Sequence, residues 1–160
     1  ARMLREKKLL TLTGSRYPLI EFSFHSDGEE ETGILRSVCR AGYRPVVAHP
    51  ERYIYVQEDP ELIDRWHRMG CLFQVNRGSL LGRFGRREQR MAVELVDRGF
   101  ATVIASDAHS AHMRTPWMKD VQQMLTREFS PVCAEVLLRE NPRRILKNQE
   151  LPPVQPEWFM

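Results

Sequence analysis

Pro45-Val46-Val47-Ala48-His49 is a short apolar run that ends in a histidine, and an amphipathic segment follows it. The run has the length and β-branched content of a buried strand. In the following segment Asp59 suits a helix N-cap, Pro60 suits the first turn and Gly70 suits the stop. A strand followed by a helix is the repeating unit of an α/β fold, and the same alternation recurs along the chain.

Four such units can be delimited from apolar periodicity and from glycine at the helix ends. The predicted strands are residues 17–23, 45–49, 71–76 and 101–106, and the predicted helices between them are residues 29–41, 59–70 and 86–98. Further helices are predicted to open at Thr115-Pro116, with Trp117 on the apolar side, and at Asn141-Pro142. Strands joined by helical crossovers run parallel, which predicts an α/β barrel or an open α/β sheet.

The composition is that of a single domain. The chain has 160 residues, of which 42% are hydrophobic and 28% charged, enough to bury a core. It contains neither an apolar run long enough to cross a bilayer nor a signal-like N-terminus, so we expect a cytoplasmic protein that is not an integral membrane protein. The net charge of +3 is mild and the basic residues are scattered, so nucleic acid is not an expected partner. The sequence leaves open whether the protein forms a homo-oligomer.

The three cysteines, Cys39, Cys71 and Cys133, lie in apolar stretches and predict reduced core residues. Cys133 and Arg139 satisfy the C-x5-R spacing of cysteine-based tyrosine phosphatases. That mechanism needs a loop whose backbone amides wrap the phosphate, whereas residues 134–138 predict an apolar helix. We therefore reject a cysteine nucleophile.

Polar residues at the carboxyl ends of parallel strands carry the most functional weight, because ligand sites of α/β folds lie there. The residues at or just past the predicted strand ends are Glu21, His49, Asn76, Asp107 and His109. Carboxylates and imidazoles are metal ligands, and residues two apart in an extended segment point the same way, which favours Asp107 and His109 as a pair. The alternative is an edge-strand carboxylate at Glu21, a turn residue at His49 and a helix cap at Asp107.

Two arginines, Arg52 and Arg114, fall on the loops next to these donors. A guanidinium group binds a phosphate through two parallel hydrogen bonds, which suits a phosphoester site. The alternative for each arginine is a surface salt bridge.

Five segments carry a family resemblance: residues 15–22, 45–53, 78–85, 105–109 and 140–146. Together they resemble the bacterial capsular-polysaccharide tyrosine phosphatases of CpsB/CapC type, in the polymerase and histidinol phosphatase (PHP) superfamily. The resemblance spans about residues 10 to 148. It implies part of a distorted (β/α)7 TIM-like barrel, with up to three divalent metals, usually Mn²⁺, that activate a water to attack phosphotyrosine.

The resemblance also implies roles for individual residues. Glu21, His49, Asp107 and His109 match metal ligands of the family, and Arg52 and Arg114 match its phosphate-facing basic residues. The implied partner is the phosphorylated tail of a bacterial tyrosine kinase of polysaccharide synthesis, and the implied process is the control of capsular or exopolysaccharide synthesis.

The family's N-terminal His-x-His and Asp-Asp-Gly segments have no counterpart in this sequence, nor do a further histidine and an upstream glutamate. We therefore expect residues 1–148 to be the C-terminal part of a PHP phosphatase domain and residues 149–160 to be a flexible tail. Little activity is expected of this chain alone, and a longer parent is expected to be active. The alternatives are a non-catalytic PHP-derived binding module and a PHP phosphatase acting on a small phosphomonoester.

Overall fold

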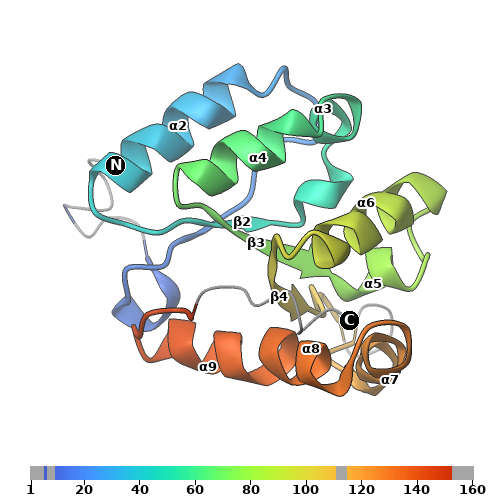
Figure 1. Cartoon of the computed structure of the whole chain (residues 1–160). Coiled ribbons are helices and arrows are strands. Elements are labelled where there is room, and N and C mark those ends of the chain that lie inside the picture. Colours follow the sequence, from blue (N-terminus) through green and yellow to red (C-terminus); the bar gives the residue numbers. More distant parts are fainter. Residues whose placement is uncertain (1–5, 7–9, 111–114, 153–160) are drawn as a thin grey trace.

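The computed structural model of the chain describes residue 6 and residues 10–110 and 115–152. Its centre is a parallel sheet with the strand order β1-β2-β3-β4. The strands are β1 (Leu19–Ile20), β2 (Val46–Ala48), β3 (Leu72–Asn76) and β4 (Ala101–Ala105). The prediction of parallel strands joined by helices is confirmed, although β1 is much shorter than the predicted strand over 17–23 (Figure 1).

Helices cover both sides of this sheet, as Figure 1 shows, with α2 and α4 on one side and α7, α8 and α9 on the other. The crossover helices are α2 (Glu29–Arg40), α4 (Glu61–Arg68) and α6 (Arg86–Asp97). The C-terminal helical elements are α7 (Lys119–Glu128), α8 (Pro131–Glu135), the π-helical turn η3 (Val136–Glu140) and α9 (Asn141–Leu146). The amphipathic pattern of the sequence is satisfied because each crossover helix buries its apolar side against the sheet.

The larger core cluster contains residues of the sheet, of α2, α4 and α6 and of α7, α8 and η3, and Trp66 of α4 is fully buried in it. The indole nitrogen of Trp66 donates a hydrogen bond to the Thr32 hydroxyl at 2.7 Å. Thr32 in turn donates to the backbone oxygen of Gly28 at 2.7 Å. A buried tryptophan of this kind contributes roughly 2–3 kcal/mol by area removed from water, provided that its N–H is satisfied.

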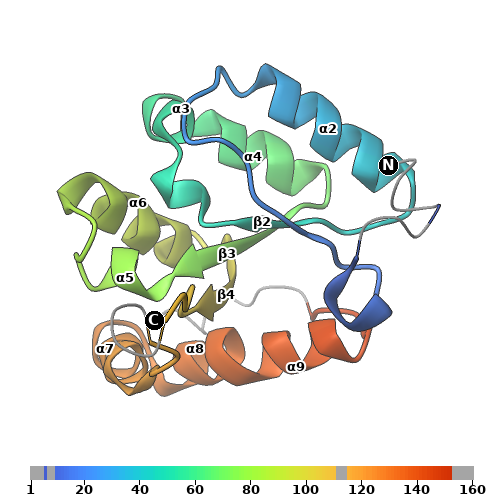
Figure 2. The ribbon, with the colours of Figure 1, turned by 180° about the vertical axis from the view of Figure 1, so that it is seen from behind.

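Described segments from the N-terminal and C-terminal regions meet on one flank, where η1 (Leu12–Gly14) lies beside α9 in both views (Figures 1 and 2). The Thr13 hydroxyl donates to the Leu146 oxygen at 2.6 Å, and the Tyr17 hydroxyl donates to the Gln149 oxygen at 2.7 Å. Arg16 forms a 2.6 Å ion pair with Glu150. Residues 149 and 150 of the segment predicted as a tail therefore pack on the domain, and residues 153–160 lie outside the described residues.

Several local predictions were wrong. The helix predicted to open at Thr115-Pro116 begins only at Lys119, and Trp117 precedes it with 62% of its surface exposed. The stretch after β2 forms two short elements that the apolar periodicity did not predict, η2 (Pro50–Arg52) and α3 (Ile54–Glu58). The loop predicted after β3 contains the helical turn α5 (Arg77–Leu80), because the Asn76 side chain accepts the backbone N–H of Gly78 and caps the turn.

The three cysteines are free, as expected. Cys39 and Cys71 lie with their sulfur atoms 3.9 Å apart, and burial raises the pKa of the Cys133 thiol to about 12. A thiol held neutral inside a helix is no nucleophile, which agrees with the rejection of cysteine-based catalysis.

Among the described residues, no helix is both long and apolar enough to cross a bilayer.

Candidate functional site

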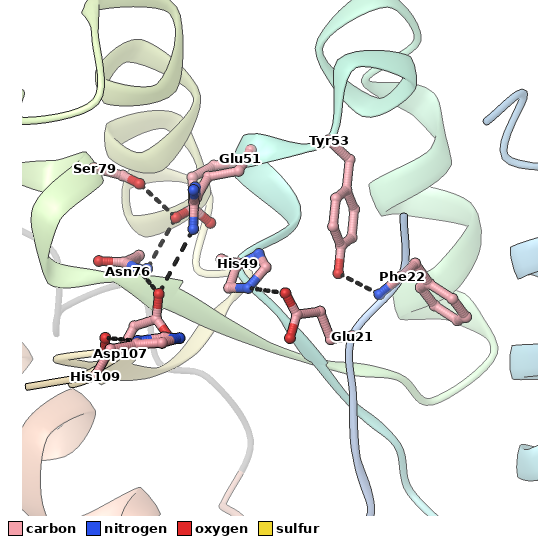
Figure 3. Close-up of polar contacts among 10 residues, drawn as sticks. Glu21, Phe22, His49, Glu51, Tyr53, Asn76, Ser79, Asp107 and His109 are labelled. Atoms are coloured by element: carbon pink, nitrogen blue, oxygen red, sulfur yellow. Dashed lines mark hydrogen bonds and ion pairs between the residues drawn. The ribbon is translucent and has the colours of Figure 1, made fainter. Parts of the chain in front are cut away.

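The predicted site residues come together at the carboxyl edge of the sheet. Glu21 directly follows β1, His49 directly follows β2, Asn76 ends β3, and Asp107 comes two residues after β4. Because the four strands are neighbours and parallel, their ends meet at one edge (Figure 3). The rule that selects polar residues at strand ends therefore led to residues that lie along one edge of the sheet, and their role as a site stays a prediction.

His49 and Glu21 form the first pair, and Figure 3 shows their side chains pointing toward each other. The His49 Nε2 atom lies 3.2 Å from a Glu21 carboxylate oxygen, with His49 buried and Glu21 largely exposed. The other ring nitrogen, Nδ1, is buried and has no hydrogen-bond partner among the described residues. A left-handed backbone at His49, with φ of 34°, turns the chain sharply after β2 and holds the ring at the sheet edge.

The electrostatic surroundings keep the His49 ring neutral. Burial lowers the pKa of His49, and the guanidinium group of Arg52 lowers it further. The carboxylates of Glu21 and Asp107 act in the opposite direction but do not cancel the first two effects. A neutral imidazole is the form that binds metal ions.

Asp107 and His109 form the second pair, and Asn76 is attached to it. The Asn76 side-chain nitrogen donates to the Asp107 carboxylate at 2.9 Å, while its oxygen accepts from Gly78. The His109 Nδ1 atom lies 2.7 Å from the backbone oxygen of Asp107 and 3.6 Å from its carboxylate. The expectation of an extended segment here was wrong, because Asp107 has a φ of 50° and the backbone turns instead of running straight.

The four predicted ligands therefore stand as two imidazole–carboxylate pairs. Within residues 10–110 and 115–152, no group of three or more His, Cys, Asp or Glu side chains is close enough to hold a metal ion. The carboxylate of Asp107 nevertheless acts on the charge of His49, so the two pairs share one electrostatic environment. Joint metal ligation by these residues stays a prediction.

Arg52 lies beside the second pair. One of its guanidinium nitrogens is 3.6 Å from the Asp107 carboxylate, and 21% of its side chain is exposed. The guanidinium carbon also lies 4.9 Å from the ring centre of Phe24 and 4.6 Å from that of Phe84. Arg52 thus reaches the predicted site, whereas Arg114 lies outside the described residues.

Glu51 is the polar residue that sequence reasoning missed. Its side chain is fully buried under the site, and one carboxylate oxygen accepts from the Asn76 backbone N–H at 2.9 Å and from the Ser79 hydroxyl at 2.7 Å. The second oxygen has no partner among the described residues. Burial raises the pKa of Glu51 to about 7, despite these two hydrogen bonds. Its place between His49 and Arg52 in one motif was the available signal.

The aromatic side chains of Phe24 and Tyr53 pack beside the His49 ring of the first pair. The Tyr53 hydroxyl accepts the backbone N–H of Phe22 at 3.0 Å, which ties the segment after β1 to the segment after β2 (Figure 3). Phe24 lies 5.7 Å from the His49 ring and 5.9 Å from the Tyr53 ring, measured between ring centres. The backbone that presents Glu21 is therefore attached to the turn that presents His49.

Comparison with known proteins places this arrangement in a family. Tyrosine-protein phosphatase YwqE of Bacillus subtilis is 32% identical over 148 residues, which are 92% of this chain and 58% of YwqE. Tyrosine-protein phosphatase CpsB of Streptococcus pneumoniae is 30% identical over 151 residues, which are 91% of this chain and 62% of CpsB. The chain thus spans about three fifths of the length of these relatives.

The fold comparison agrees with the sequence comparison. A chain from the crystal structures of YwqE from Bacillus subtilis and CpsB from Streptococcus pneumoniae, described as unique metal-dependent tyrosine phosphatases, superimposes with a TM-score of 0.88 and 31% identity. The match covers 99% of this chain and 64% of the solved one. The family described as capsular polysaccharide synthesis, CpsB/CapC, matches residues 1–147, and this chain therefore belongs to the CpsB/CapC family.

Proposed function

We propose that the chain is the catalytic part of a metal-dependent protein-tyrosine phosphatase that regulates capsular or exopolysaccharide synthesis. The observation that carries the proposal is the meeting of two imidazole–carboxylate pairs and Arg52 at the carboxyl ends of four adjacent parallel strands. The names of the relatives, which are tyrosine-protein phosphatases, supply the reaction class.

The donor set fits a divalent metal. Glu21 and His49 would hold it on one side, and Asp107 and His109 on the other, with oxygen and nitrogen donors that suit Mn²⁺. The 3.2 Å approach of the His49 Nε2 atom to the Glu21 carboxylate supports this reading, because it places a nitrogen donor and an oxygen donor side by side. We propose Mn²⁺ as the resident metal, with up to three ions in a complete site. When bound, such ions polarise the phosphoryl group and lower the pKa of a coordinated water.

The chain's own residues perform the positioning. Asn76 holds the Asp107 carboxylate through a 2.9 Å hydrogen bond, and the capped turn α5 fixes the amide of Asn76 in that orientation. The Arg52 guanidinium binds the phosphate oxygens and offsets the charge that develops on them as the ester bond breaks. The same role is proposed for Arg114.

The remaining proposals concern context. The sheet and its helices are proposed to be part of a distorted (β/α)7 barrel, with residues 1–148 as one domain and residues 149–160 as a tail segment. The proposed substrate is the phosphorylated tail of a tyrosine kinase of polysaccharide synthesis in the cytoplasm. The high TM-score to a metal-dependent tyrosine phosphatase supports the first point, and the name of the family supports the second.

A second candidate function is a non-catalytic binding module derived from a PHP phosphatase. The observation that favours it is the lack, within the described residues, of any three-donor group that could hold a metal. This candidate predicts no metal in the purified protein and no Mn²⁺-stimulated hydrolysis.

The test combines elemental analysis with hydrolysis of a phosphotyrosine peptide in Mn²⁺, with and without orthovanadate. We expect metal in a longer parent that contains this chain, together with vanadate-insensitive, Mn²⁺-stimulated hydrolysis by that parent, and little hydrolysis by this chain alone. Asp107→Ala and His109→Ala should lose both, while Arg52→Ala should keep the metal and lose phosphate affinity. Asp97→Ala, on the exposed end of α6, is the matched control for loss of a carboxylate. Metal content and rates unchanged in Asp107→Ala would refute the ligand assignment.

A second substrate separates the phosphotyrosine proposal from its neighbour within the superfamily. Rates on a kinase-tail phosphotyrosine peptide are compared with rates on small phosphomonoesters such as histidinol phosphate. Faster turnover of the peptide supports the protein-phosphatase proposal, and faster turnover of the small compound assigns the chain to small-molecule hydrolysis.

A further inference from the structure

Arg52 differs from an ordinary phosphate-binding arginine in what surrounds its guanidinium group. The group lies over two aromatic rings at once, Phe24 from the segment after β1 and Phe84 from the loop between α5 and α6. The ring centres are 4.9 Å and 4.6 Å from the guanidinium carbon, within the range of a cation–π interaction. Two elements far apart in the sequence thus converge on one side chain.

Each ring is fixed by its own surroundings. Phe24 packs against the His49 and Tyr53 rings, and its backbone oxygen accepts the N–H of Ile54 at 3.1 Å. Phe84 lies directly over Gly78, where a Cβ atom would come within 2.6 Å of the phenyl ring. The absence of a side chain at Gly78 is therefore what lets Phe84 approach the site.

Both phenylalanines are only partly buried, and their rings lie beside the guanidinium group of Arg52. An exposed aromatic edge next to a guanidinium plane offers stacking and edge-to-face contacts to an aromatic group. A phosphate ester held by Arg52 carries its alcohol portion close to these rings. An aryl group gains from that contact, whereas the short alkyl chain of phosphoserine offers no π surface.

We propose that Phe24 and Phe84 are specificity-determining residues that make this site prefer aryl phosphates over alkyl phosphates. Their rings also position the guanidinium group of Arg52. The inference rests on the proposed function in one respect, namely that Arg52 binds the phosphate. It goes further by naming the residues that recognise the aromatic ring of the substrate.

The experiment measures binding of phosphotyrosine and of phosphoserine to the chain by isothermal titration calorimetry, in a chelator so that neither ester is hydrolysed during the titration. Phe24→Leu and Phe84→Leu keep an apolar side chain and remove the ring. Phe84→Tyr restores a ring at the same place. Phe100→Leu is the matched control, because the Phe100 ring underlies Arg98 at 4.6 Å in a similar contact on another part of the molecule.

We expect the unaltered chain to bind phosphotyrosine more tightly than phosphoserine. Each leucine variant should reduce that ratio by about fivefold, the effect of losing one aromatic contact. Phe84→Tyr should retain the ratio, and Phe100→Leu should leave it unchanged. If the two rings had a purely structural role, their loss would weaken the binding of both ligands equally. An unchanged ratio of phosphotyrosine to phosphoserine affinity in both leucine variants therefore overturns the inference.

The outcomes also separate this inference from the proposed function. Ring-dependent preference for phosphotyrosine without any Mn²⁺-stimulated hydrolysis refutes the phosphatase and leaves the inference standing. Hydrolysis of phosphotyrosine, with a binding preference that is the same in both leucine variants as in the unaltered chain, supports the phosphatase and overturns the inference. Equal binding of the two compounds by the unaltered chain, or binding of neither, also overturns the inference.

Discussion

Glu51 is a carboxyl group with no exposed surface, and replacing it with glutamine tests how the site is built. Glutamine keeps an oxygen that can accept from the Asn76 backbone and from the Ser79 hydroxyl. It cannot ionise, so it removes the cost of placing a negative charge inside the protein. The Glu51→Gln variant should therefore differ from the unaltered chain in how its stability depends on pH.

The sign follows from the direction of the pKa shift. Burial raises the pKa of Glu51 from its ordinary value of 4.5 to about 7 in the folded protein. The unfolded chain releases this proton first, so the folded state loses stability as the pH rises from 4.5 towards about 7. Since one pKa unit corresponds to about 1.4 kcal/mol, the full loss is about 3 kcal/mol, of which about 2.5 kcal/mol falls between about pH 5 and about pH 8.

The assay is urea unfolding of metal-free protein in a chelator across that pH range, followed by tryptophan fluorescence, to which the buried Trp66 contributes. The free energy of unfolding of Glu51→Gln should rise relative to the unaltered chain by about 2.5 kcal/mol from the acid to the alkaline end. The amide nitrogen of glutamine replaces the unpartnered oxygen and adds a constant penalty, which does not affect the slope. Glu58→Gln, on the exposed end of α3, controls for the chemical change. A difference that stays flat with pH refutes the reasoning.

Two further predictions concern close contacts. Gly78→Ala should displace Phe84 and lower stability by about 1–3 kcal/mol. Gly33→Ala, in an open position within α2, should raise stability by roughly 0.5–1 kcal/mol. Thermal melts of both variants check this prediction, and equal melting temperatures contradict it. Thr32→Val should cost about 1–3 kcal/mol in urea unfolding by leaving the Trp66 N–H unpaired in the core, whereas Thr32→Ser, which keeps the hydroxyl, should cost less than Thr32→Val. Equal losses in these two variants would show that the hydrogen bond is not the cause.

Local signals accounted for the regular elements of the fold. The apolar run at 45–49 and the one at 71–76 are buried strands, and the glycines after α2, α4 and α6 follow the helix ends as predicted. Trp117 shows where such signals fail. Its apolar character and the preceding Thr-Pro pair suggested a helix start, but the chain begins α7 two residues later and leaves the ring exposed.

The candidate site was predictable in position and not in geometry. The ends of parallel strands meet by construction, so Glu21, His49 and Asp107 could be selected before their contacts were known. The pairing of Glu21 with His49, by contrast, depends on the tight turn after β2, and that of Asp107 with Asn76 depends on the turn after β4. That one metal cluster joins the two imidazole–carboxylate pairs is still a prediction.

The sequence alone determined the alternation of strands and helices, the parallel sheet and the edge at which function is expected, because periodicity, caps and connection lengths act over a few residues. Only the tertiary structure decided that Glu51 is buried beneath that edge and that Phe24 and Phe84 meet at Arg52. These contacts join residues from separate strand–helix units, and their burial depends on how the units pack. No local pattern encodes that packing, because it is the combined result of many long-range contacts.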